Sequence, residues 1–82
     1  MAGSGGVASA PAHVVEVLRD AAAAGHEVRL EVAGPSGSLE RRRVRPLSVE
    51  VGRLRAVDVA RESELTIAVH RIASVVAVAP RS

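Results

Sequence analysis

The spacing of apolar residues predicts one helix near the start of the chain. Between about Ser9 or Pro11 and Ala24, apolar side chains recur three and four positions apart, which is typical of an amphipathic helix. This apolar stripe consists of Val14, Val17, Leu18 and Ala21. Pro11 is tolerated in a first helical turn, and Gly25 stands where a left-handed residue would end the helix.

From Glu27 onward the period changes to two, which predicts a series of short strands. The first strand places Val28, Leu30 and Val32 on one face. Gly34-Pro35-Ser36-Gly37 predicts a tight turn, so the strand that follows it returns antiparallel. Further strands are expected at 47–51, 53–59, 65–69 and 74–78, with a polar turn at 61–64 and a helical turn or kink at 70–72. One helix and five or six strands fit a small barrel or sandwich.

The returning strand, residues 40–47, is strongly basic. Its arginines are too numerous for one face of a strand whose side chains alternate, and they are Arg41, Arg42, Arg43 and Arg45. We expect Glu27 and Glu31 to form ion pairs with some of these arginines across the hairpin. Each such pair stabilises the fold by roughly 0.2–1 kcal/mol. The other arginines either bind phosphate or another anion, or form a solvated edge that discourages pairing with other chains. Pro46 cannot donate to a sheet, which predicts a corner or an edge there.

The composition predicts one small domain, with a flexible leader at 1–10, a folded region at 11–79 and a tail at 80–82. The chain has 82 residues, 48% of them hydrophobic, with no aromatic residue and no cysteine, and all 11 basic residues are arginine. It contains neither a long apolar run nor a signal peptide, so we expect a cytoplasmic protein without a membrane partner.

Motifs for catalysis are lacking. The histidines, His13, His26 and His70, have no metal-ligand spacing and are expected at the surface. There is no nucleophile elbow, no phosphate loop and no isolated pair of carboxylates. We therefore expect no enzyme, no metal and no cofactor.

Four strings, in order, resemble the WYL domain, a small Sm-like antiparallel β-barrel with a leading helix found in bacterial transcription regulators. The resemblance runs from about His13 to Val78. The family patterns are L-R-I-x-Y, E-R-x-V-x-P-L, W-Y-L-x-A-Y-D and D-R-I. Their counterparts are Val28-Arg29-Leu30-Glu31-Val32, Arg42-Arg43-Val44-Arg45-Pro46-Leu47, Gly52-Arg53-Leu54-Arg55-Ala56-Val57-Asp58 and Val69-His70-Arg71-Ile72. Gly52 and Arg53 replace the family's Trp and Tyr, and His70 replaces its Asp.

The resemblance implies a mainly β, Sm-like barrel of five or six strands with a basic pocket near the named hairpin and the Arg-Ile turn. Arg71 matches the family arginine, and Arg53 stands in place of the tyrosine. Arg43 and Arg45 join them as candidate site residues because of the charge density around them.

The expected function is a non-catalytic sensing or accessory domain that binds single-stranded DNA, RNA or a small anionic ligand. The resemblance places such a domain beside other domains of a larger parent, in a bacterial transcription regulator or a helicase-associated DNA-processing protein. The alternative is a protein-interaction or homo-oligomerisation module that acts through an exposed barrel edge.

Overall fold

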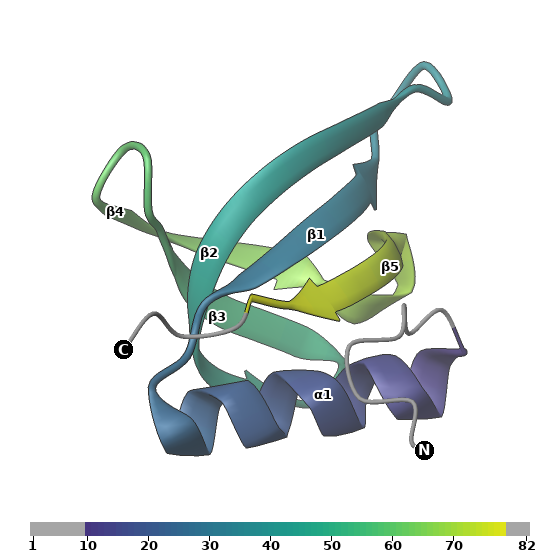
Figure 1. Ribbon diagram of the computed structural model, residues 1–82. Coiled ribbons are helices and arrows are strands. Elements are labelled where there is room, and N and C mark those ends of the chain that lie inside the picture. The colour runs from purple at the N-terminus through teal and green to yellow at the C-terminus, as the bar shows by residue number, and fades with distance from the viewer. Residues whose placement is uncertain (1–9, 79–82) are drawn as a thin grey trace.

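The computed structural model describes residues 10–78, which form one helix followed by five antiparallel strands (Figure 1). The elements are α1 (Pro11–Ala24), β1 (Val28–Ala33), β2 (Leu39–Glu50), β3 (Arg53–Asp58), β4 (Ser63–Ala68), the short 3-10 helix η1 (Val69–Arg71) and β5 (Ile72–Ala77). The prediction of a mainly β chain with one N-terminal helix is confirmed. The expected tail and all of the expected leader but Ala10 lie outside the described residues.

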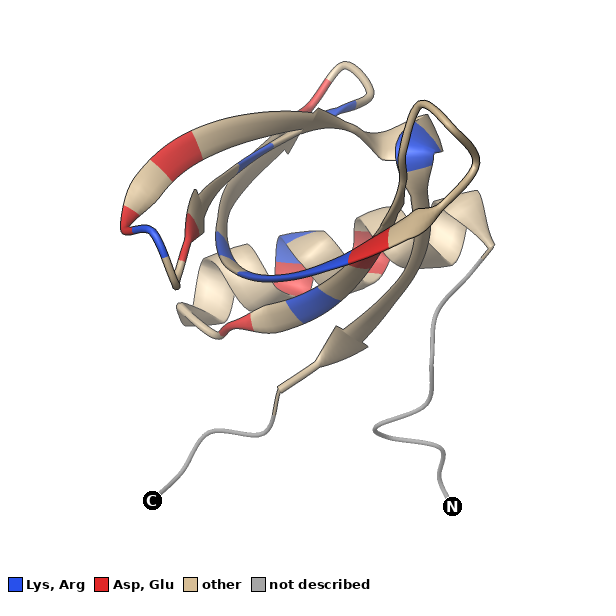
Figure 2. Cartoon of the chain, turned by 90° about the horizontal axis from the view of Figure 1, so that it is seen from above, with Lys and Arg blue, Asp and Glu red and all other residues tan. Residues whose placement is uncertain are grey.

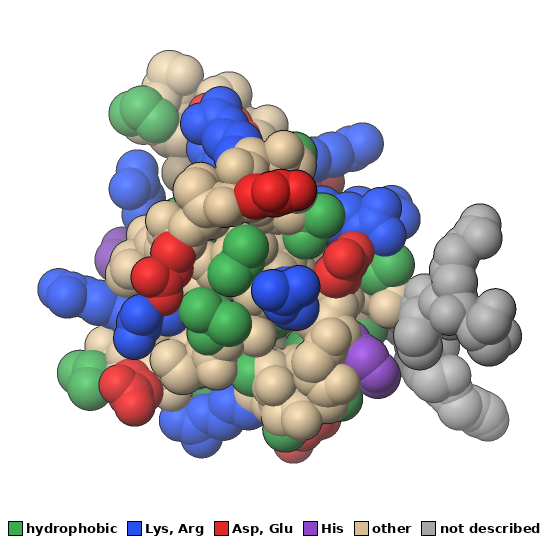
Figure 3. Space-filling view, turned by 90° about the vertical axis from the view of Figure 1, so that its left-hand side faces the viewer, with side chains coloured by type: hydrophobic (Ala, Val, Ile, Leu, Met, Phe, Trp, Pro, Cys, Tyr) green, Lys and Arg blue, Asp and Glu red, His purple; other side chains and the backbone are tan. Residues whose placement is uncertain are grey.

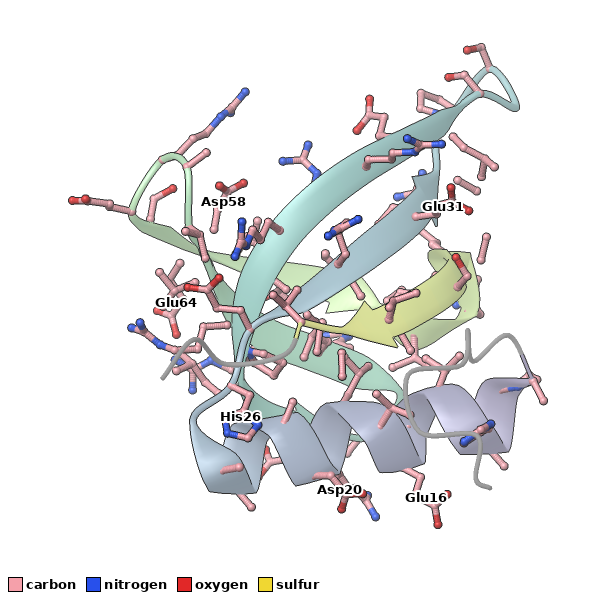
Figure 4. All side chains as sticks on the ribbon, viewed as in Figure 1. Glu16, Asp20, His26, Glu31, Asp58 and Glu64 are labelled. Atoms are coloured by element: carbon pink, nitrogen blue, oxygen red, sulfur yellow. The ribbon has the colours of Figure 1, made fainter. Side chains whose placement is uncertain are left out.

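Helix α1 has the predicted apolar stripe. The buried residues of this stripe are Val14, Leu18 and Ala21. Gly25 ends the helix with φ of 73°, a left-handed conformation that glycine adopts without steric cost. Glu16 and Asp20 point away from the sheet (Figure 4). Within residues 10–78, no helix is both long enough and apolar enough to cross a membrane.

The strands form one strongly curved sheet in the order β4-β3-β2-β1-β5. Helix α1 lies across one end of this curved sheet and is seen through it from the opposite end (Figures 1 and 2). Its apolar side packs against β2, β5 and η1. The core between helix and sheet consists only of aliphatic residues: Val14, Leu18, Ala21, Val28, Leu30, Val44, Val49, Leu54, Ala56, Val69, Ile72 and Val75.

Strand β2 is the longest strand, and it changes its pairing partner partway along. Residues 39–44 pair with β1, whereas residues 44–50 pair with β3. The register with β3 shifts between Pro46 and Ser48, an irregularity of the β-bulge kind that bends a strand. This change of partner turns one half of the sheet over the other and produces the concave inner face.

The structure corrects the prediction of a separate strand after Pro46. β2 continues through this buried proline, so the sheet has five strands, although the predicted bend is present as the bulge. The carbonyl of Arg43 accepts the N–H of Val59 at 3.0 Å, on the β3 side. Alternation along the strand then turns the nitrogen of Pro46 toward the β1 side, where pairing has already ended at Val44. The missing N–H therefore costs no sheet hydrogen bond.

The predicted turns after β1 and β4 are confirmed, whereas the turn expected at 61–64 ends at Glu62, because Ser63 and Glu64 already pair with β3. The N–H of Gly37 donates to the carbonyl of Gly34 at 3.1 Å, so the Gly-Pro-Ser-Gly segment forms the tight turn between β1 and β2. η1 forms the expected helical turn before the last strand. The first N–H of η1, from Val69, donates to the carbonyl of Gly52 at 2.8 Å and holds η1 against the β2–β3 turn.

The β2–β3 turn contains an unfavourable residue. Val51 and Gly52 have φ of 49° and 72°, which is the two-residue hairpin turn that normally carries Asn-Gly. A β-branched side chain is strained at positive φ, and that of Val51 is 98% exposed, so packing gives no compensation.

We predict that Val51→Asn raises the free energy of unfolding by about 1 kcal/mol, because asparagine tolerates the left-handed conformation. Urea denaturation followed by circular dichroism measures the change. Val51→Thr is the matched control, since it adds polarity but keeps the branch at Cβ, and we expect no gain from it. Equal midpoints for the two variants would contradict the assignment of strain.

Candidate nucleic-acid and anion interface

The arginines of β2 are divided between the two faces of the sheet. Arg41, Arg43 and Arg45 are exposed on the outer, convex face. Arg42 shares the inner face with buried Val44 and is itself half-buried. The prediction that one face could not hold all four is therefore confirmed, and one arginine turns toward the concave side.

Arg42 meets a buried carboxylate on the inner face. Its Nη1 lies 3.3 Å from Oδ2 of Asp58, a residue that is 5% exposed. The second carboxylate oxygen, Oδ1, accepts the backbone N–H of Arg61 at 3.1 Å. The other end of the Arg42 guanidinium, Nη2, lies 3.3 Å from Oε1 of Glu40. Asp58 therefore holds both the side chain of Arg42 and the backbone of the β3–β4 turn.

A hollow of about 420 Å³ opens on the inner face, and none of its lining residues belongs to α1. We call it the inner hollow. Its charged lining residues are Glu40, Arg42, Asp58, Arg61 and Arg71. Its largest aliphatic lining residues are Val32, Leu65 and Ile67. Neither Arg61 nor Arg71 forms an ion pair with another residue of 10–78, so both guanidinium groups are available to an anion.

A second hollow, of about 490 Å³, lies between the first half of β2 and the β3–β4 turn. We call it the outer hollow. It is lined by Glu40, Arg41, Arg42, Arg43, Asp58, Ala60 and Arg61. β3 does not extend along this part of β2, because its pairing begins at Val44. The backbone of Arg41 faces the same open side as that of Arg43, which leaves its N–H without a partner strand.

The predicted pairing of arginines with glutamates across the β1–β2 hairpin is confirmed. Nε of Arg43 lies 2.7 Å from Oε1 of Glu27, and Nε of Arg41 lies 3.4 Å from Oε2 of Glu31. All four side chains are at least one-third exposed, and exposed pairs of this kind contribute only about 0.2–1 kcal/mol. Figure 3 likewise shows basic and acidic side chains interspersed on one side of the molecule.

The four candidate site residues do not come together. Arg71 lines the inner hollow, and Arg43 lines the outer one. Arg45 is exposed two residues further along β2 and lines neither of these hollows. Arg53 lies beside the β2–β3 turn and lines a separate hollow of about 310 Å³ with Arg55. Arg53 and Arg71, which the resemblance places near one basic pocket, therefore line different hollows.

Sequence reasoning did not include Arg42, Asp58 and Arg61 among the site residues. The signal for Arg42 was present, because it stands two positions before Val44 and so shares the inward face of the strand. Nothing in the sequence indicated Arg61, since its place depends on the turn that Asp58 stabilises. Arg71 pairs with neither Asp58 nor Glu64: Asp58 binds Arg42, and Glu64 binds Arg55.

The three histidines are exposed, as expected: His13 on α1, His26 just after it and His70 in η1. Comparison of the sequence with protein-family models and with curated proteins finds no match. The assignment of a site therefore rests on the arrangement of the arginines and the two hollows.

We predict that Asp58→Ala lowers the free energy of unfolding by about 2–3 kcal/mol, because it leaves Arg42 half-buried and the N–H of Arg61 without its acceptor. Asp58→Asn keeps an acceptor for that N–H and should cost about 1 kcal/mol. Urea denaturation measures both losses. Glu40→Ala removes the exposed partner of Arg42 and is the control, with an expected loss below about 0.5 kcal/mol. Equal losses for Asp58→Ala and Glu40→Ala would contradict the structural role of Asp58.

Proposed function

We propose that the chain is a non-catalytic domain that binds nucleic acid or another phosphate-bearing anion at the inner hollow. The carrying observation is that Arg61 and Arg71, which have no ion pair with any residue of 10–78, line one hollow together with Arg42. Arginine presents a rigid fork of donors that matches the oxygens of a phosphate. An apolar floor beside these groups strengthens each charge interaction by reducing its exposure to water.

The absence of catalysis is part of this proposal. Asp58 is the one charged residue that is buried among residues 10–78. Both of its carboxylate oxygens already accept hydrogen bonds, so neither is placed to act as a general base. The three arginines of the hollow are suited to holding an anion, which supports a non-catalytic domain.

The resemblance to WYL domains supports the same site. Arg42, Asp58 and Arg71 come from three of the four matched strings and line the inner hollow together. On this reading the curved sheet is a small Sm-like barrel that stays open between β4 and β5. We extend the proposal to its context: a sensing or accessory domain of a bacterial transcription regulator or a helicase-associated DNA-processing protein.

A second candidate function has its own observation. β4 and β5 stand at the two ends of the strand order, so each has one strand neighbour and one open edge among the described residues. Open edges present unpaired N–H and C=O groups that pair readily with another chain. A homo-oligomer, or a complex with another domain formed by such pairing, is therefore the alternative.

We predict that a fluorescent oligonucleotide of about twelve nucleotides binds at low salt, and that Arg71→Gln weakens it roughly tenfold through the loss of charged hydrogen bonds. Fluorescence anisotropy measures the affinity, and thermal unfolding checks that each variant folds. Arg53→Gln is the matched control, because it removes the same charge at a separate hollow. Equal losses from the two variants would contradict the inner hollow as the site.

Two measurements on the same protein sample distinguish the two candidate functions. If no oligonucleotide or other phosphate-bearing anion binds at low salt, the binding function is wrong. Light scattering that gives a monomer at every protein concentration would instead contradict edge-to-edge assembly of the chain with itself.

A further inference from the structure

The inner and outer hollows adjoin each other. They share four lining residues: Glu40, Arg42, Asp58 and Arg61. Arg71 belongs only to the inner hollow, whereas Arg41 and Arg43 belong only to the outer one. The ion pair between Arg42 and Asp58 therefore stands where the concave face of the sheet gives way to its convex face.

Basic groups continue along this path. The order from the inner to the outer hollow is Arg71, then Arg61 and Arg42, then Arg43 and Arg41. The glutamates paired with Arg41 and Arg43 are held by exposed contacts that a phosphate can replace. Each guanidinium carries five N–H donors, so Arg43 can keep Glu27 at its Nε and still reach a second anion.

The backbone adds a donor to the outer hollow. β3 does not reach this part of β2, and the N–H of Arg41 faces the open side. Backbone N–H groups are common phosphate partners in protein–nucleic acid contacts. The open edge of β2 thus supplies a neutral donor between two arginine side chains.

The chemistry of the path excludes stacking on rings. The chain has no Phe, Tyr or Trp, and no histidine lines either hollow, so no base can stack on an aromatic ring along this path. Glu40 and Asp58 lie in the middle of the path, but Arg42 binds both of them. The remaining contacts are those of arginine forks and one backbone donor with phosphate oxygens.

We propose that the ligand is a single strand of nucleic acid that runs from the inner hollow, past the Arg42–Asp58 pair, to the outer hollow. Its phosphates bind Arg71 and Arg61 at one end and Arg43 and Arg41 at the other. Its bases are not read. This inference rests on the proposed function, and it makes the site a groove for several nucleotides rather than a pocket for one small anion.

The test compares oligothymidylates of about four and about twelve nucleotides by fluorescence anisotropy over a range of salt concentrations. We expect the longer strand to bind at least tenfold more tightly and to show a steeper dependence on salt. Arg43→Gln should weaken binding of the longer strand about fivefold and reduce its slope of log affinity against log salt by about 0.7. The affinity for the shorter strand should not change. Both strands are single, so base pairing plays no part.

Arg45→Gln is the matched control, because Arg45 stands on the same face of the same strand but lines neither hollow. It should leave both affinities within about twofold of the starting protein. Glu27→Gln is a second variant, and it should have the opposite effect on affinity. It removes the ion pair of Arg43, so the longer strand should bind more tightly. Thermal unfolding of each variant confirms that the fold is kept.

The outcomes distinguish the extended groove from binding at the inner hollow alone. Equal affinities for the short and long strands, or equal effects of Arg43→Gln and Arg45→Gln, overturn the extended groove but leave binding at the inner hollow intact. Failure of every strand to bind at low salt overturns both. A clear preference for oligothymidylate over oligoadenylate overturns recognition through phosphates alone. Binding of inorganic polyphosphate without binding of any oligonucleotide overturns the assignment of the ligand to nucleic acid.

Discussion

The change of pairing partner in β2 is the constraint on which the rest of the structure depends. The first half of β2 belongs to one half of the sheet with β1, and its second half belongs to the other half with β3. One continuous strand therefore connects two parts of the sheet that face different directions. The bend encloses the aliphatic core beside α1, and it leaves the starting residues of β2 without a strand on the β3 side. The core and the open basic edge are two results of the same change of partner.

This arrangement places the arginines of β2 in different surroundings on the two faces of the sheet. On the outer face, Arg41 and Arg43 have exposed glutamates opposite them, and such pairs add little to stability. On the inner face, Arg42 meets Asp58 in a partly water-excluded site. Neighbouring arginines of one strand therefore differ in how strongly they interact with their carboxylate partners. The alternation of side chains along the strand decides which face each arginine takes.

Much of the fold could be predicted from local patterns, because those patterns have local causes. The stripe ending at Ala21, the glycine cap at Gly25 and the turn at Gly34 each depend on a few neighbouring residues. The continuation of β2 through Pro46 could not be predicted, since it depends on which side of the strand has lost its partner. The site depends still more on long-range contacts: Arg42 and Asp58 are 16 residues apart in the chain. Their charges come together only when β2 and β3 pair.

Stability alone does not account for the Arg42–Asp58 pair. Taking two opposite charges out of water costs free energy that their mutual attraction only partly returns, and well-packed apolar residues in such places often give an equally stable or more stable protein. The core of this chain is otherwise aliphatic, and an aliphatic pair at these positions would extend it without a break. The pair instead stands at the border of two hollows, where Asp58 fixes the direction of Arg42 and the course of the turn that carries Arg61. A carboxylate in that position holds the guanidinium of Arg42 and the backbone of Arg61 in place, which under the proposed function reduces the ordering that binding requires.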